Sequence, residues 1–124
     1  MPIMSQDQYF FNLDNPDAGI ARELVPGITT RIFAGDQAML SFISFEPNSE
    51  GSSHSHAEEQ WGVVLEGSGT RIQDGESFLV KKGDFWVTPG GVEHSFIAGP
   101  EGAKLIDIFA PPREAYRKSG EGYS

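Results

Sequence analysis

The chain consists of short runs rich in β-branched and aromatic residues, each ended by glycine, proline or an Asp-Gly pair. Runs of this kind at intervals of roughly 8–12 residues predict the strands of a β-sandwich or barrel. The Asp74-Gly75 pair predicts a two-residue hairpin turn. No window shows sustained helical periodicity, and only the tail from Pro112 fits a single helical turn. The expected strands are Met39–Phe45, Gln60–Glu66, Thr70–Gln73, Glu76–Val80, Phe85–Thr88, Glu93–Ile97 and Ala103–Phe109.

The length and composition of the chain limit its organisation and its partners. A chain of 124 residues is long enough for one domain and too short for two, so we expect a single domain over residues 1–124. Its polar ends, Met1–Asp7 and Ser119–Ser124, are expected to be loose. The absence of cysteine excludes disulfides, thiolate nucleophiles and thiolate metal sites. The net charge of −9 argues against nucleic acids and anionic membranes as partners. Because neither a membrane-spanning run nor a secretory signal is visible, we expect a cytoplasmic protein.

The three histidines of the chain are His54, His56 and His94. Residues two apart in a strand point to the same face, so His54 and His56 can bind one metal ion together. His94 belongs to a later expected strand and can close such a site from across a barrel. Imidazole is a common ligand of Zn, Ni, Mn and Fe, and an oxygen ligand often joins it. The alternative is that His54 and His56 lie in a solvated loop and that His94 caps a turn.

The spacing around the first two histidines resembles the first motif of the cupin family. That motif is H-x-H, three or four residues, Glu, six residues and Gly. This chain has His54 and His56, three residues, Gln60, six residues and Gly67. Glutamine therefore stands where most cupins have glutamate.

The region before the third histidine resembles the second cupin motif, which is Gly, five residues, Pro-x-Gly, two residues and His. Gly83, Pro89, Gly91 and His94 match it with every spacing kept. The resemblance covers about residues 37–110. It implies an all-β fold, the double-stranded β-helix or jelly-roll barrel of the cupins.

The resemblance implies that His54, His56, His94 and Gln60 hold a divalent metal ion, which is Zn, Ni, Mn or Fe. Glu58 is an alternative fourth ligand if the loop before the strand is bulged, whereas Glu59 is expected on the opposite face. A site without a fourth protein ligand is also open.

A glutamine ligand would change the electrostatics of the site. Three neutral imidazoles and an amide leave the full 2+ charge on the ion, whereas a carboxylate would neutralise half of it. A more electropositive ion polarises a bound oxygen more strongly. We therefore expect Lewis-acid chemistry on a hydroxylated or carbonyl substrate rather than oxygen activation.

A second set of candidate residues lies near the end of the chain. Asp107 alternates with Leu105 and Phe109 in an apolar strand, and burial there would raise its pKa towards the range of general acid–base work. The alternative is an exposed Asp107, with Ile106 and Ile108 facing the core. Arg113, just past two prolines, can hold an anionic group or be an ordinary surface residue.

The combination of HxHxxxQ, a second-motif histidine and D-x-F-x-P-P-R resembles the small pectin-degradation cupins. These proteins linearise unsaturated monouronates to open-chain 5-keto-4-deoxyuronates. The resemblance implies a substrate site formed by Asp107, Phe109 and Arg113, with a small sugar acid as the partner.

Two other functions stay open, a cupin dioxygenase that uses Fe or Mn and a non-catalytic cupin that binds a sugar or metabolite. Because small cupins commonly pair through sheet faces, we expect a homodimer. The aromatic segment Gln8–Leu13 and Trp61 or Trp86 are candidates for that contact, or belong to the core.

Overall fold

The structure, a computed structural model, describes residues 9–123. In this part of the chain almost all regular structure is β-strand, so the all-β prediction is confirmed. The strands are β1 (Ile20–Val25), β2 (Ile28–Ala34), β3 (Met39–Phe45), β4 (Glu59–Gln73), β5 (Glu76–Lys81), β6 (Phe85–Thr88), β7 (His94–Ala110) and β8 (Gly120–Glu121). Two short 3-10 helices are η1 (Pro16–Ala18) and η2 (Glu114–Arg117), of which η2 is the helical turn expected after Pro112.

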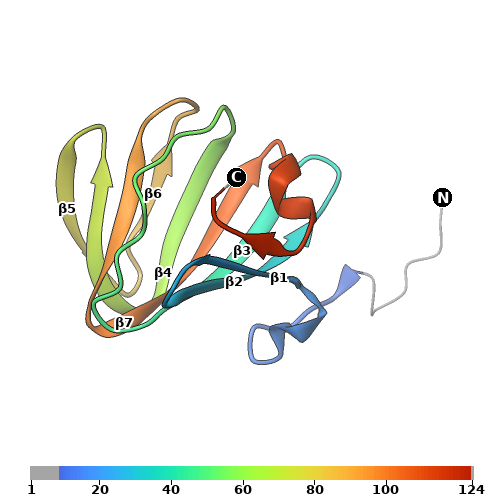
Figure 1. Cartoon of the computed structure of the whole chain (residues 1–124), viewed down its shortest axis with the longest axis horizontal. Helices are drawn as coiled ribbons and strands as arrows, with labels where there is room; N and C mark the ends of the chain where they lie inside the picture. The colour runs from blue at the N-terminus through green and yellow to red at the C-terminus, as the bar shows by residue number, and fades with distance from the viewer. Residues whose placement is uncertain (1–8, 124) are drawn as a thin grey trace.

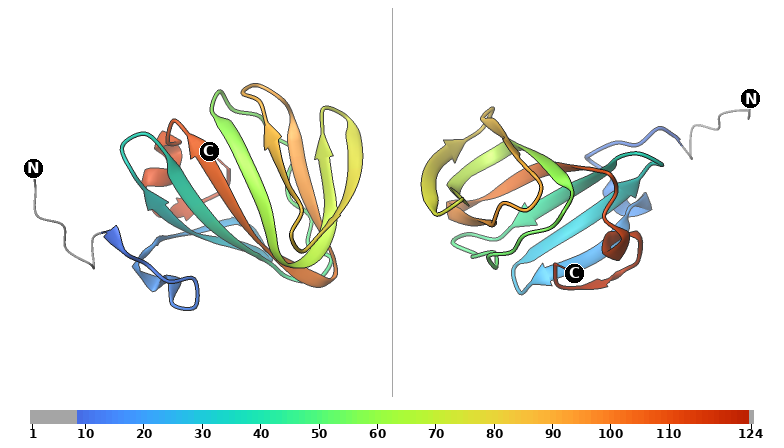
Figure 2. Two further views of the ribbon diagram at one scale, coloured as in Figure 1. Left: turned by 180° about the vertical axis from the view of Figure 1, so that it is seen from behind. Right: turned by 90° about the horizontal axis from the view of Figure 1, so that it is seen from above.

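The strands form one sheet in the order β5-β4-β7-β3-β2-β1-β8, with β6 paired to β4. The sheet folds over (Figure 1), so that one half contains β5 and the other contains β6 together with β3, β2 and β1, which β4 and β7 join to β6. The long strands β4 and β7 run through both halves as an antiparallel pair. Figure 2 shows the same folded sheet from behind and from above. The two halves thereby enclose an interior into which alternate residues of every strand point.

The continuity of β4 and β7 corrects the prediction of two shorter strands in each of these regions. Gly67 was expected to end a strand, but β4 passes through it with register shifts on either side. The backbone φ of Gly67 is +79°, and a Cβ placed there would lie 2.1 Å from the carbonyl oxygen of Gly102 on β7. Glycine here lets two bending backbones approach closely, and the pairing continues through a bulge. The expected hairpin turn is confirmed, with positive φ at Asp74 and Gly75.

Residues 119–123 are ordered, contrary to the expectation of a loose Ser119–Ser124, of which Ser124 lies outside the described residues. Strand β8 pairs in parallel with β1. The reason is Arg22 of β1, whose guanidinium donates to four carbonyl oxygens of the tail. The four acceptors are the carbonyl oxygens of Ala115, Lys118, Glu121 and Gly122. The other expected loose end, Met1–Asp7, lies outside the described residues.

The interior of the folded sheet contains an apolar core and a group of buried polar side chains. Trp86 packs against the core, which removes it from the candidate dimer contacts, whereas Trp61 is 43% exposed. Buried polar groups are costly unless they are paired, so they indicate where a site lies. They are Arg22, Thr30, Ser41, Gln60, Arg71, Thr88, His94, Ser95, Asp107 and Arg113. None of the helices in residues 9–123 is long and apolar enough to cross a membrane.

Candidate metal centre

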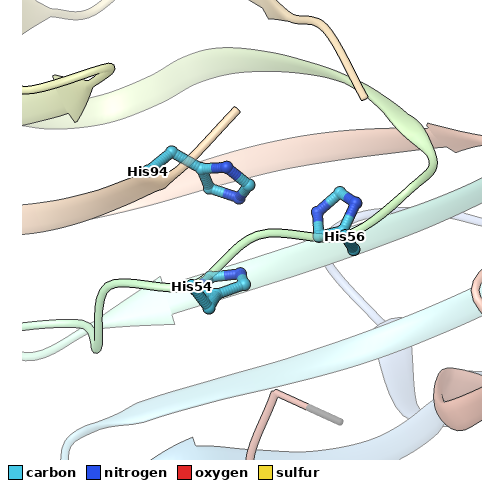
Figure 3. A group of neighbouring side chains, drawn as sticks. All are labelled: His54, His56 and His94. Carbon is cyan, nitrogen blue, oxygen red and sulfur yellow. The ribbon is translucent and has the colours of Figure 1, made fainter. Parts of the chain in front are cut away.

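The three histidines converge at one end of the folded sheet (Figure 3). His54, in the loop before β4, and His94, at the start of β7, exchange backbone hydrogen bonds of 3.0 and 2.9 Å. The carbonyl oxygen of His56 accepts from the N–H of Gly91 at 2.8 Å, which fixes the Pro-Gly-Gly turn against the first loop. One ring nitrogen of each histidine lies within 4.8 Å of those of the other two. The loop contacts, rather than one continuous strand, therefore bring the three imidazoles together.

The Nδ1 atom of each imidazole faces a backbone carbonyl two residues away. The distances are 2.9 Å from His54 to Ser52, 3.0 Å from His56 to Glu58 and 2.8 Å from His94 to Val92. A carbonyl oxygen only accepts, so Nδ1 carries the proton and Nε2 carries the free lone pair of a neutral ring. This is the arrangement in which metal-bound histidines are commonly held.

Burial keeps the imidazoles neutral. Desolvation lowers the pKa of His54 to about 4 and that of His94 to about 3, and it also lowers the pKa of His56. The Nε2 atom of His94 is buried and has no hydrogen-bond partner among the described residues. The three imidazoles are neutral and direct their lone pairs inward, and one of these nitrogens, Nε2 of His94, has no hydrogen-bond partner among the described residues. Such a group fits a divalent metal ion.

The Gln60 side chain, only 3% exposed, lies beside this cluster at the start of β4. Its Oε1 is 2.9 Å from Nε2 of His56. Because the proton of His56 is on Nδ1, its Nε2 carries a lone pair, and so does Oε1 of Gln60. A cation bound by both atoms is one arrangement that makes their contact favourable. Two ligand atoms at about 2.1 Å from one metal, at right angles, lie about 3 Å apart. The geometry thus favours Gln60 as the fourth ligand, which stays a prediction.

The two glutamates before Gln60 point elsewhere. A carboxylate oxygen of Glu58 lies 3.4 Å from Nδ1 of His56, on the side of the ring away from Nε2. Glu59 is exposed and accepts a hydrogen bond of 3.2 Å from the Trp61 indole, as the expected outward orientation requires. In this geometry Glu58 orients a histidine and does not face the cluster.

Asp107 of β7 points into the interior, as the alternation with Leu105 and Phe109 predicts, while Ile108 is 40% exposed. One of its carboxylate oxygens, Oδ1, is buried and has no hydrogen-bond partner among the described residues. Burial raises the pKa of Asp107 to about 6, and the charge of Arg71 and a hydrogen bond from Gln60 oppose this rise. A carboxyl group with this pKa can both accept and return a proton near neutral pH.

Arg71 of β4 is a site residue that sequence reasoning missed. Its guanidinium donates to Thr88 Oγ1 at 2.8 Å and lies 5.3 Å from the centre of the Trp86 ring. It lines the same cavity as His54, His94 and Asp107. One extra residue in β4 between Val64 and Glu66 shifts its alternation and turns Arg71 inward, whereas a strict period of two from Gln60 would place it outside.

Phe109 lines this cavity, and the Arg113 guanidinium lies beside the Phe109 ring. Arg113 is 6% exposed, so it is not an ordinary surface arginine. Its guanidinium carbon lies 4.2 Å from the Tyr116 ring centre and 5.6 Å from that of Phe109. Phe109 also contacts the His56 ring, at 5.5 Å between centroids. Phe109 is thus packed between a histidine of the cluster and an arginine.

Tyr123, near the C-terminus, is a further residue that sequence reasoning missed. Its ring lies 4.1 Å from that of His54, between centroids, and it lines the cavity that contains Asp107. No local signal marks it, because only the long-range contacts of the tail bring it there. The cavity has about 30 Å³ open to water, which is room for roughly two water molecules.

Comparison with known proteins identifies the family. A family model for the cupin domain matches residues 41–109. The chain is 30% identical over 108 residues to the pectin degradation protein KdgF of Dickeya dadantii, covering 86% of this chain and 94% of that protein. A crystal structure of an RmlC-like cupin from Shewanella frigidimarina superposes with a TM-score of 0.77 at 27% identity, over 87% of this chain and 95% of the other. The structure of KdgF from Halomonas sp. gives a TM-score of 0.72 at 27% identity, over 77% and 88% of the two chains. The chain therefore belongs to the cupin family and has its barrel fold.

Proposed function

We propose that this cupin is a metal-dependent enzyme that linearises 4,5-unsaturated monouronates to 5-keto-4-deoxyuronates. The observation that carries the proposal is the Asp107 carboxyl, which is buried and has an oxygen without a partner among the described residues. It faces the same cavity as the histidine cluster and has a pKa raised to about 6. The similarity to the pectin degradation protein of Dickeya dadantii supports a sugar acid as the substrate.

In this proposal His54, His56, His94 and Gln60 hold the metal ion. When bound, a divalent cation there supplies Lewis-acid polarisation of a substrate oxygen, and a neutral ligand set leaves its full charge available. The protein's own task is to position the sugar and to move one proton.

The reaction is an isomerisation that one carboxyl group can complete. Ionised Asp107 accepts the proton of the hydroxyl on C1, the C1 carbonyl forms, and the bond from C1 to the ring oxygen breaks. The electron pair stays on that oxygen, which becomes the enolate of the C4–C5 double bond. Protonated Asp107 then returns its proton to C4, and the enolate becomes the C5 ketone. No other reactant is needed, so a group that is both base and acid near neutral pH suffices.

Arg113 is the residue proposed to bind the substrate carboxylate. Its Nη1 is buried and unpaired among the described residues, so a carboxylate there would satisfy a donor that otherwise has none. Phe109, packed against both the Arg113 guanidinium and the His56 ring, keeps the two in place and shapes the sugar pocket.

The test is to add metal-loaded protein to freshly prepared unsaturated monouronate and to follow loss of the enol-ether absorbance. Asp107→Asn should retain metal, measured by elemental analysis, and lose turnover. Asp36→Asn, at an exposed position, is the matched control and should match the wild type. Absorbance that decays equally with and without the wild-type protein would sink the proposal. Oxygen consumption coupled to substrate would instead indicate a dioxygenase, and binding without turnover a sensor.

We also propose that the protein is a cytoplasmic homodimer. The outer face of the sheet carries exposed apolar side chains on neighbouring strands, Trp61 on β4, Phe85 and Val87 on β6 and Ile108 on β7. An exposed apolar surface of this kind is typical of an interface. Trp61→Glu should shift the mass measured by light scattering from dimer to monomer. A wild-type protein that is monomeric at all concentrations would contradict this.

A further inference from the structure

The C-terminal strap, residues 114–123, lies beside β1, with which its strand β8 pairs (Figure 1). Its attachment is specific. Arg22 donates to the Gly122 carbonyl at 2.8 Å and to the Glu121 carbonyl at 2.9 Å. The N–H of Gly122 donates to the Glu23 carbonyl at 2.8 Å. These contacts involve β1 alone, and neither Arg22 nor Glu23 lines the metal cavity.

The end of the strap reaches the metal centre through Tyr123. The Tyr123 ring lies against His54, and the backbone N–H of Ser52 donates to its hydroxyl group. A Cβ placed on Gly51 would lie 2.8 Å from that hydroxyl oxygen, so glycine leaves the space that the tyrosine uses. The loop that carries the first two histidines is thus shaped to receive this side chain.

The strap also occupies one donor of Arg113. The Nη2 of Arg113 donates to the carbonyl oxygen of Tyr123, whereas its Nη1 has no partner among the described residues. Arg113 is the side chain proposed to bind an anionic ligand. The strap therefore holds its Nη2, while its Nη1 has no partner among the described residues.

The cavity is too small for an organic ligand. It offers about 30 Å³, whereas pockets for small-molecule ligands measure about 300–1,000 Å³. An organic ligand that enters this cavity must therefore displace a wall. Two of the lining residues, Tyr116 and Tyr123, belong to the strap, whereas the others lie on β1, β3, β4 and β7 or in the His54 loop. Tyr123 lies beyond η2, in the part of the strap that backbone carbonyl contacts hold at the edge of the sheet.

We propose that the C-terminal strap is the movable wall of the ligand site and that Tyr123 is the residue through which it governs access to the metal. When a ligand enters, Arg113 exchanges the Tyr123 carbonyl for an anionic group of the ligand. This proposal goes beyond the uronate reaction, because it holds for any ligand that must reach the histidine cluster.

The test uses the rate at which the cobalt(II)-loaded protein loses its metal to the chromogenic chelator 4-(2-pyridylazo)resorcinol. In the wild type the rate should level off as chelator is increased, because opening of the strap becomes limiting. Tyr123→Ala should raise that limiting rate by about tenfold or more. Arg22→Ala should do the same although it does not touch the cavity. Tyr9→Ala, at an exposed position, is the matched control and should behave as the wild type.

The outcome that would overturn the proposal is a limiting rate in Tyr123→Ala and Arg22→Ala within twofold of the wild type. If Arg22→Ala does not fold, a chain that ends at Lys118 replaces it and removes the strap contacts of β8 and Tyr123. A faster rate in Tyr123→Ala with a folded Arg22→Ala protein at the wild-type rate would also overturn it, because the strap would then not move as a unit. Since no sugar is present, failure of the uronate assay leaves this test intact.

Discussion

Replacement of Gln60 by glutamate, the residue of most cupins, should move the acid–base behaviour of Asp107. In the wild type the Gln60 amide donates a hydrogen bond to Asp107, which lowers the pKa of that carboxyl from the value its burial alone would give. A glutamate at position 60 removes the donor and adds a negative charge. Both changes favour the protonated form of Asp107, so its pKa rises.

The size of this rise follows from simple electrostatics. Two like charges about 4 Å apart interact by about 4 kcal/mol at an effective dielectric constant of about 20, which alone would raise a pKa by about 3. The metal ion, Arg71 and Arg113 offset part of this repulsion. We therefore expect Gln60→Glu to raise the pKa of Asp107 by about one to two units above its wild-type value. The pH at which half of Asp107 is ionised rises by the same amount.

The assay is the pH dependence of kcat/KM for the unsaturated uronate, with metal content measured on the same samples. The acid limb of the Gln60→Glu profile should lie about one to two pH units above that of the wild type. Gln37→Glu, at an exposed position, controls for the added charge and should leave the profile unchanged. An acid limb at the wild-type pH in a Gln60→Glu protein that retains its metal would refute the role given to Asp107.

Two further predictions concern stability. In metal-free protein the folded pKa values of about 4 for His54 and about 3 for His94 lie below the ordinary 6.5. The unfolded chain therefore binds more protons between pH 3 and 6.5, and the melting temperature should fall as pH is lowered from 6.5 to 4, even though the raised pKa of Asp107 opposes this below pH 6. A melting temperature that rises as the pH of EDTA-treated protein is lowered to 5 would contradict this. Gly67→Ala should destabilise the protein by several kcal/mol because of the backbone collision with β7, whereas Gly75→Ala, with positive φ but nothing within 4 Å, should cost only about 1 kcal/mol. Equal losses in denaturant titrations would show that the contact in β4 is unimportant.

Local patterns were sufficient where a structural feature depends on neighbouring residues. The boundaries of Met39–Phe45 and Phe85–Thr88 agree with β3 and β6, and the inward orientation of Asp107 follows from simple alternation. The spacing of the two motifs was enough to predict that the three histidines meet at one site, as they do. The turn at Pro26-Gly27, between β1 and β2, is a further local signal, from which the first hairpin was predictable although no strand was expected there.

Features that depend on distant contacts were not predictable in this way. The inward position of Arg71 depends on the extra residue that β4 carries between Val64 and Glu66, and only the pairing with β7 reveals that shift. The ordered tail depends on Arg22, about a hundred residues earlier in the chain. Tyr123 reaches His54 only through that attachment. Alternation and composition describe only the neighbours of a residue along the chain. Arg71, Arg22 and Tyr123 obtain their roles from residues that are distant in the sequence.

The backbone carbonyls that hold the three Nδ1 atoms have an evolutionary consequence. Each histidine takes its tautomer from a backbone carbonyl two residues away, and only His56 also has a side chain, that of Glu58, beside its Nδ1. Substitutions among the proposed substrate residues Asp107, Phe109 and Arg113 therefore leave these carbonyl contacts in place. A site built in this way lets its chemistry diversify while its metal-binding frame is inherited unchanged, which fits a fold that serves many unrelated reactions.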